Sequence, residues 1–426
     1  MAQGARPGLR LVRPVRDQVE FRMACLDDLI GADHTARLVW RYVEGLDLGA
    51  LYDAVSSVEG EPGAPKTDPA VLAAVWLYAV IEGVGSARHV ARLIETDAAF
   101  AWIMGGVATN HHTLSDFRTA AGPALDRALA DSVAVLVQQG LVTIEAIAVD
   151  GMRVRAAAGA GSFKRRAKLE TLRAEAAAHV DTLNGELDID PGASHARVEA
   201  RRRAAAQDRL DRIEAAQAQA RAIEAERMAE AQAQRRNKVK QSRRDDEKGP
   251  PASTTDPDAR VMRMADGGFR PAYNVQNMVE PESGLILAVD AISGGDRGRL
   301  DDTVAAIESR YGYKPKRLLA DGGYDSKTDI AACEADGVAI YCPLLDNDRP
   351  RAGEPEGVAA WRARMQSEEG KACYAKRREC ELPHAQMRNR GLRQFLVRGR
   401  AKVQAVALWF AHAHNFFICM RLAAAA

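Results

Sequence analysis

The chain lacks three features that would each indicate a particular class of protein. Net charge is one: 59 Lys and Arg against 58 Asp and Glu leave a formal charge of +1 over 426 residues, which excludes a uniformly basic protein that coats nucleic acid. The six cysteines include no Cys-x-x-Cys pair and lie far apart, so neither a disulfide framework nor a zinc knuckle is expected. The longest apolar run, residues 69–81, is too short to cross a bilayer, and the basic N-terminus lacks the apolar segment of a signal peptide. These absences predict a soluble, cytoplasmic protein with no membrane partner.

The composition is nevertheless that of a folded protein with more than one domain. Hydrophobic residues make up 47% of the chain, which excludes a wholly disordered protein, and the length suggests two or three domains. From residue 28 to about residue 140, apolar residues such as Leu29, Ala36 and Val43 recur at helical spacing, without strand-like alternation. We therefore expect a helical N-terminal domain over residues 1–140.

The pattern changes at residue 141. Residues 141–150 alternate like a strand that ends at Asp150-Gly151, and residues 161–254 predict a charged, Ala-rich helical hairpin and linker, with a helix break at Asn184-Gly185. Further strands are expected at residues 269–279, 285–292, 316–321 and 338–343, with helices at 299–310 and 326–335. This order predicts an α/β domain, formed by residues 141–160 and 255–426, in which helices cover a mixed sheet.

Two aspartates stand where predicted strands end. Asp150 precedes Gly151, and Asp321 precedes Gly322. Because open α/β sheets place ligand sites at the carboxyl ends of their strands, the two carboxylates are candidates for one site. The alternative is that each Asp only favours a turn, as Asp-Gly commonly does.

A third candidate group lies near the C-terminus. Tyr374, Arg377, Glu381 and Arg388 are spaced so that, at roughly 100° per residue, all four would lie within about 60° of arc on one helix. Such a face would present a carboxylate between two guanidinium groups and a phenol, provided that the helix tolerates a kink at Pro383. A solvated charged helix is the alternative interpretation.

This spacing resembles a known signature. Tyr-x2-Arg-x3-Glu-x6-Lys is typical of a superfamily of bacterial insertion-sequence transposases of the DDE type, and here Arg388 replaces the Lys. Several other segments also look like that family, in the same order: GVGSARHVARLI and NHHTLSDFR in the helical region, then TDPDAR, AYNVQ, ADGGYDS and RGLRQFLVRGRAKV. The resemblance implies a ribonuclease-H-like catalytic core with a helical-hairpin insertion after its first strand. It also implies an acidic triad of Asp150, Asp321 and Glu381, and an N-terminal domain for DNA binding or dimerisation.

The implied triad suits phosphodiester chemistry. Cleavage requires an activated water or 3′-hydroxyl, in-line geometry and neutralisation of the charge that grows on the phosphate. Two Mg²⁺ ions, or Mn²⁺, supply all three, and Mg²⁺ prefers oxygen ligands. The resemblance therefore implies that the three carboxylates bind two metal ions, with Asp150 as the bridging ligand, and that no side chain acts as nucleophile.

Local charge indicates contact with double-stranded DNA. Residues 388–402 contain no acidic residue, and such a patch neutralises phosphates and makes binding depend on salt. A solvated helix surface with loose counterions is the alternative. The expected phosphate contacts are Tyr374, Arg377, Arg388, Arg390, Arg393 and Arg398. The implied partners are terminal inverted repeats, target DNA and a second copy of the chain, in a homodimer or larger assembly at the nucleoid.

Other polar residues are weaker candidates. Asp290 is expected to be an ordinary sheet residue and Asp296 to cap the next helix, although the family has an acidic residue in a similar place. His412 and His414 are two apart on a predicted helix, so they face different directions and cannot bind one ion. Asn274 and Gln276 share a strand face and are either core polar groups or contacts near the active site.

Three functional hypotheses follow. The first is a transposase that cleaves the ends of its element and joins the 3′-hydroxyl to target DNA. The second is a non-catalytic DNA-binding or assembly protein, and the third is a hydrolytic nuclease of the same fold that performs no strand transfer.

Overall fold

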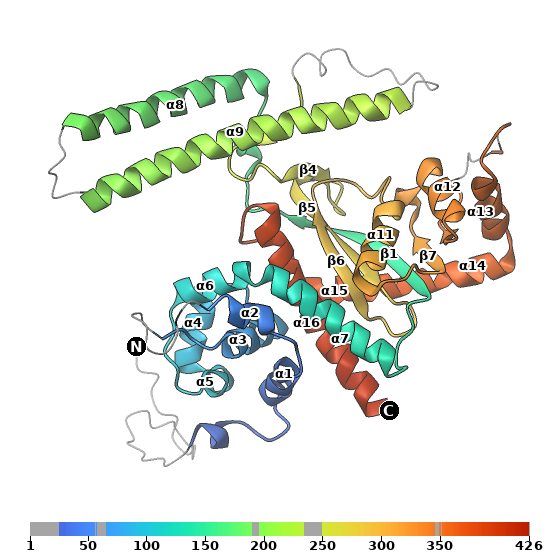
Figure 1. Cartoon of the computed structure of the whole chain (residues 1–426), viewed down its shortest axis with the longest axis horizontal. Helices are drawn as coiled ribbons and strands as arrows, with labels where there is room; N and C mark the ends of the chain where they lie inside the picture. Colours follow the sequence, from blue (N-terminus) through green and yellow to red (C-terminus); the bar gives the residue numbers. More distant parts are fainter. Residues whose placement is uncertain are drawn as a thin grey trace, which may run out of the picture.

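The protein consists of a helical N-terminal region, a mixed β-sheet and a long helical hairpin that projects from the body (Figure 1). The computed structural model describes residues 25–55, 57, 65–189, 196–233, 249–345, 349–350 and 352–425. This arrangement confirms the predicted mixed α/β class and the helical N-terminal region.

The N-terminal region is built around one helix that is buried on all sides. Asp68 caps this helix, α3, by accepting a hydrogen bond of 2.8 Å from the backbone N–H of Ala70. Pro69 follows at the first helical position, where its missing N–H costs nothing. Inside the helix, Trp76 is fully buried and donates to the backbone oxygen of Leu114 at 2.8 Å. The elements of this region are η1 Leu26–Leu29, α1 Thr35–Glu44, α2 Gly49–Asp53, α3 Pro69–Ile81, α4 Ala87–Thr96, α5 Ala98–Met104, α6 His111–Ala120 and α7 Gly122–Gln138.

The main sheet has six strands in the order β4-β5-β1-β7-β8, and β6 also pairs with β5. β1 is antiparallel to β5 and parallel to β7, and β7 is parallel to β8. The sheet is therefore mixed, and the β5–β6 hairpin forms where the sequence predicts it. The strands are β1 Ala146–Arg155, β4 Arg260–Arg263, β5 Phe269–Val279, β6 Ile286–Ile292, β7 Arg317–Ala320 and β8 Ala339–Tyr341.

One sequence prediction about β1 is wrong. The strand does not close at Asp150-Gly151 but continues to Arg155, because β5 pairs with it as far as Ala272. Long-range pairing outweighs the local turn preference of Asp-Gly. Asp150 therefore lies within a strand and not at its end.

The two faces of the sheet pack against different helices. Ile147 and Val149 of β1 point into a core shared with α11, α12 and α13, whereas Ala148 and Met152 point into the core shared with α16. This alternation follows from the two-residue period of a strand. The remaining helices are α11 Leu300–Tyr311, α12 Lys327–Ala335, α13 Glu356–Gln366, α14 Glu368–Ala375, α15 Glu381–Asn389 and α16 Arg400–Ala425, and the 3-10 helices are η2 Ala160–Ser162, η3 Gly322–Tyr324 and η4 Lys376–Cys380.

Helix α16 is the core helix between the N-terminal helices and the sheet. Among the described residues it alone is long and apolar enough to span a membrane by composition, and 78% of its most apolar window is buried inside the protein. Its polar groups also bond within the fold: His412 Nε2 lies 2.9 Å from the oxygen of Leu125, and His414 Nε2 lies 2.8 Å from that of Gly284. The two histidines thus face different partners, as their spacing predicts.

The projecting hairpin consists of α8 Arg166–Ile189 and α9 Ala196–Ala233 (Figure 1). Its seam is thin and includes Leu169, Ala216 and Ala220. The break predicted at residues 184–185 does not occur, since α8 continues through both residues. At the base of the hairpin, β2 Phe163–Lys164 pairs with β3 Ala252–Ser253.

Candidate active site

Two of the predicted acidic residues lie next to each other on adjacent strands. The parallel register pairs Val149 of β1 with Ala320 of β7, so Asp150 and Asp321 follow side by side on the same face. Asp150 Oδ1 accepts from the N–H of Gly151 at 2.8 Å. Asp321 directly follows β7 and caps η3, where its Oδ1 accepts from Gly323 N–H, also at 2.8 Å.

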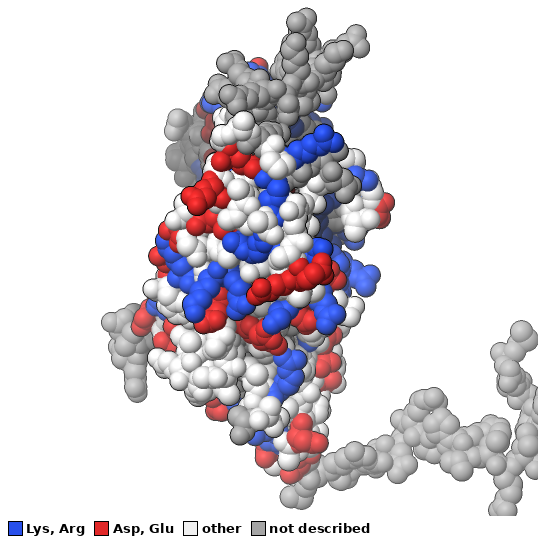
Figure 2. All heavy atoms as spheres, turned by 90° about the vertical axis from the view of Figure 1, so that its right-hand side faces the viewer, with Lys and Arg blue, Asp and Glu red and all other residues white. Residues whose placement is uncertain are grey.

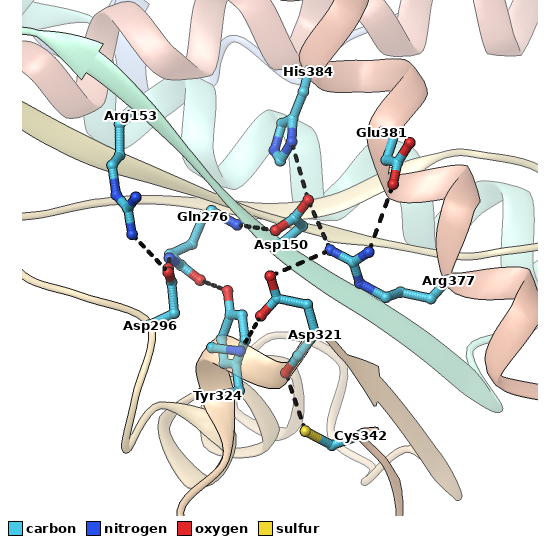
Figure 3. A network of polar contacts seen from close by, with 12 residues as sticks. Asp150, Arg153, Gln276, Asp296, Asp321, Tyr324, Cys342, Arg377, Glu381 and His384 are labelled. Carbon is cyan, nitrogen blue, oxygen red and sulfur yellow. Dashed lines mark hydrogen bonds and ion pairs between the residues drawn. The ribbon is translucent and has the colours of Figure 1, made fainter. Parts of the chain in front are cut away.

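The third acidic residue reaches the same place from the C-terminal segment. Arg377 lies between the three carboxylates (Figure 3). Its Nη2 is 3.0 Å from Asp150 Oδ2 and 3.7 Å from Asp321 Oδ2, and its Nη1 is 3.6 Å from Glu381 Oε1. The fold therefore gathers Asp150, Asp321 and Glu381 around one guanidinium group.

The C-terminal segment is not the continuous helix that the spacing predicts. α14 ends at Ala375, the 3-10 helix η4 follows, and α15 begins at Glu381. Pro383 then lies in the first turn of α15, where a missing N–H is tolerated. Because of this break, Arg377 and Glu381 are on different elements; Arg377 faces the two aspartates, and Glu381 contacts Arg377. Tyr374, at the end of α14, is half-buried.

The surroundings shift the pKa values of the two aspartates in opposite directions. Burial acts to raise the pKa of Asp150, but contact with His384 and the charge of Arg377 more than offset it, and the pKa lies below its ordinary value. Burial raises the pKa of Asp321, and the neighbouring charge of Asp150 adds to this rise despite Arg377. Two nearby carboxylates with shifted pKa values of opposite direction are typical of functional sites.

His384 is a site residue that the sequence analysis missed. The residue is 5% exposed, and its Nδ1 lies 3.6 Å from Asp150 Oδ2 (Figure 3). Nε2 of the ring is buried and has no hydrogen-bond partner among the described residues. The available signal was the position three residues after Glu381, which on a helix brings the side chain to the same side.

A second polar cluster lies behind the strands that carry the aspartates. Asp296 does not cap α11, whose N-cap position is Arg299. Instead, Asp296 Oδ1 accepts from Asn274 Nδ2 at 2.6 Å and from Gln276 Nε2 at 2.7 Å. Asn274 and Gln276 are thus buried polar groups, and both contact an acidic residue close to the candidate site. Asp290 behaves as expected for a sheet residue and pairs with Arg400 at 3.2 Å.

Gly151 has no room for a side chain. A Cβ at this position would lie 2.4 Å from Asp296 Oδ1 and 2.5 Å from both Asn274 Oδ1 and Gln276 Nε2. We expect Gly151→Ala to lower the free energy of unfolding by about 1–3 kcal/mol, because a tightly packed group must shift. Chemical denaturation measures this effect.

Gly159 provides a matched control for that substitution. It has a negative φ of −84°, and nothing lies within 4 Å of a Cβ built there. Gly159→Ala should leave the free energy of unfolding essentially unchanged. Equal stability of the two variants would contradict the close packing at Gly151.

The predicted basic residues differ in their surroundings. Arg388, Arg393 and Arg398 are exposed, and none forms an ion pair within the described part of the chain. Arg390 is half-buried and lies over the ring of Phe417, 4.9 Å from its centroid, so a phosphate contact would require it to leave that ring. Elsewhere the charges are mixed: Figure 2 shows Lys and Arg interspersed with Asp and Glu on the side of the molecule where α12, α13 and α14 lie.

The carboxylates have the chemistry to bind a divalent ion. Within the residues that the structure describes, no group of three His, Cys, Asp or Glu side chains is already arranged as a metal site, and Arg377 stands between the three carboxylates. Because the Arg377 guanidinium contacts all three carboxylates, the cluster already attracts a positive charge. Since Mg²⁺ and Mn²⁺ prefer oxygen ligands, the residues fit such an ion once the guanidinium moves aside.

Comparison with known families identifies two segments of the chain. Residues 24–120 match the family described as Transposase domain (DUF772), and residues 249–416 match the Transposase DDE domain. The second match includes Asp321 and Glu381, whereas Asp150 lies between the two matched segments. No curated protein and no solved structure matches the chain. Both matched families are transposase domains, in the order that the sequence resemblance implies, and the chain belongs to the DDE transposases of insertion sequences, enzymes that act on DNA.

Proposed function

We propose that this transposase cleaves the ends of its insertion sequence and joins the freed 3′-hydroxyl to target DNA. The observation that carries the proposal is the convergence of Asp150, Asp321 and Glu381 on the guanidinium of Arg377. In this proposal residues 141–160 and 255–426 form a ribonuclease-H-like catalytic domain. The mixed sheet supports it, since the first Asp lies on the central strand β1 and the second follows the neighbouring strand β7.

Each residue of the site would have a separate role in catalysis or DNA binding. Asp150, Asp321 and Glu381 would hold two Mg²⁺ or Mn²⁺ ions, which supply an activated oxygen nucleophile and neutralise the developing charge when bound. Arg377 would exchange its carboxylate contacts for a DNA phosphate, which its planar fork suits. Its Nε is buried without a hydrogen-bond partner among the described residues, so its present contacts leave one donor unused. Tyr374 lies near the end of α14, three residues before Arg377, and would be a further phosphate contact.

Exposed arginines would bind the DNA backbone. The triple variant in which Ala replaces Arg388, Arg393 and Arg398 should bind DNA with a weaker salt dependence. The slope of log K for DNA binding against log salt concentration should become shallower by about 3, because each lost phosphate contact contributes about 0.9 on duplex DNA. Fluorescence anisotropy with a labelled duplex that carries the terminal repeats, measured across a salt series, gives the slope.

The control for this variant removes charges that already have acidic partners. Arg270, Arg299 and Lys371 pair with Asp266, Asp302 and Glu368 respectively, so their triple replacement should leave the slope nearly unchanged. A slope that stays at the wild-type value in the Arg388, Arg393 and Arg398 variant would show that these residues do not contact phosphate.

A strand-transfer assay tests the function itself. Purified protein is incubated with labelled terminal repeats and a target plasmid in Mg²⁺, with EDTA as the control. Joined products support the proposal. Bound but uncut DNA would instead indicate an assembly protein, and cuts without joining would indicate a hydrolytic nuclease. From the family resemblance we also propose that the active form is a homodimer or larger assembly in the bacterial cytoplasm.

A further inference from the structure

We propose that Asp296, acting through Gln276 and Tyr324, is a positioning residue that fixes Asp150 and Asp321 relative to each other. This inference rests on the proposed role of the two aspartates as metal ligands. Asp296 itself does not join them as a ligand, because its carboxylate is already occupied by donors from the protein. Its role is to hold the backbone that carries them.

The carboxylate of Asp296 is the centre of a buried network. Its Oδ1 accepts from Asn274 and Gln276 at 2.6 and 2.7 Å, and its Oδ2 lies 3.4 Å from Arg153 Nη2 (Figure 3). Its side chain is only 13% exposed, and both amide residues are buried. Three donors on one carboxylate leave little freedom for it to move.

The network touches the backbone directly after Asp150. Gly151 lies between Asp150 and the network, and a Cβ there would be within 2.4–2.5 Å of three of its polar atoms. Because successive residues of a strand point to opposite faces, Asp150 faces Arg377 while the back of the same strand rests on Asp296. A shift of Asp296 would therefore move the peptide that carries Asp150.

The same network reaches the turn after Asp321. Tyr324, in the 3-10 turn that Asp321 caps, is fully buried and donates its hydroxyl hydrogen bond to Gln276 Oε1. Gly323 lies against the cluster too, since a Cβ built on it would be 3.6 Å from Asp296 Oδ2. The hydrogen bonds thus run from Tyr324 through Gln276 to Asp296, and Asp296 in turn contacts Arg153 and lies against Gly151 of β1.

If the Asp296 network only stabilised the fold, buried polar side chains would not be needed there. Buried polar groups add little net stability compared with apolar packing, whereas hydrogen bonds between buried side chains fix their relative positions. Residues that orient metal ligands from behind commonly change metal affinity by tenfold or more when they are replaced. Asp296 has the position and the contacts for that effect.

The test measures Mn²⁺ binding to the full-length protein without DNA, by isothermal titration calorimetry. Asp296→Asn keeps the shape of the side chain but places a donor where the network needs an acceptor, and Tyr324→Phe removes one hydrogen bond. Each variant is expected to weaken Mn²⁺ binding about tenfold. Asp290→Asn is the matched control, because Asp290 lies opposite Gln276 in the β5–β6 register but pairs with Arg400, and its Mn²⁺ affinity should equal that of the wild type.

Thermal unfolding in EDTA and Mn²⁺-dependent cleavage separate positioning from folding. We expect the Tyr324→Phe variant to unfold close to the wild-type temperature and to regain cleavage at saturating Mn²⁺. Unchanged Mn²⁺ affinity in both network variants, with wild-type affinity lost in Asp150→Asn, would overturn the positioning role and leave the metal site intact. If the wild type itself binds no Mn²⁺, the proposed function fails and this inference falls with it.

Discussion

Asp150→Asn is expected to reduce strand cleavage by about 10³-fold or more while leaving DNA binding and folding intact. Asp150 contacts Arg377 at 3.0 Å and adjoins Asp321 on the neighbouring strand, so it is the carboxylate nearest to the centre of the cluster. Loss of several kcal/mol of transition-state stabilisation corresponds to a decrease of this size. Asn has the same shape and keeps one oxygen, so the packing around β1 should persist.

Cleavage of labelled terminal-repeat DNA measures the effect, and electrophoretic mobility shifts in Ca²⁺ measure binding. Asp290→Asn serves as the control, since that residue is paired with Arg400 away from the cluster. Cleavage within tenfold of wild type in Asp150→Asn would contradict the assignment of Asp150 as a metal ligand.

Arg377→Ala is expected to have two effects of opposite sign on stability. Without metal, Asp150 and Asp321 lose their shared cation, and we expect the free energy of unfolding to fall by about 1–3 kcal/mol. The lower part of that range is favoured because Asp321 and Glu381 are 38% and 68% exposed. With Mn²⁺ present, the carboxylates are free to bind the ion, so the metal-induced rise in unfolding temperature should exceed that of the wild type.

Differential scanning fluorimetry in EDTA and in a Mn²⁺ series measures both effects. Arg377→Lys is the matched variant: it keeps one positive charge without the planar fork, and it should lie between wild type and Arg377→Ala in EDTA. If Arg377→Ala is as stable as wild type in EDTA and shows no larger response to Mn²⁺, the guanidinium does not hold the carboxylates together.

Local sequence patterns predicted much of the mixed sheet. The β5–β6 hairpin, the helix α12 and the mixed pairing of strands all follow from alternation, turn residues and connection rules. Asp150 and Asp321 were candidates for the same reason, since each interrupts or follows an apolar strand. These features depend on residues close together in the chain.

Features that depend on distant partners were not predictable in this way. β1 runs past Asp150-Gly151 because β5 pairs with it, and α14 gives way to η4 before Glu381. The contacts of Asp296 join side chains from β1, β5 and the loop after β6, so no spacing within one segment indicates them. For His384 the only local signal is its position three residues after Glu381, because its contact with Asp150 joins α15 to the distant strand β1.

Anomalous diffraction from crystals grown with Mn²⁺ tests whether Asp150, Asp321 and Glu381 together bind divalent ions. We expect an anomalous peak in contact with these three carboxylates, with the Arg377 guanidinium displaced from its position between them. Absence of any Mn²⁺ peak at the cluster, with Arg377 still bridging the carboxylates at saturating metal, would contradict this expectation.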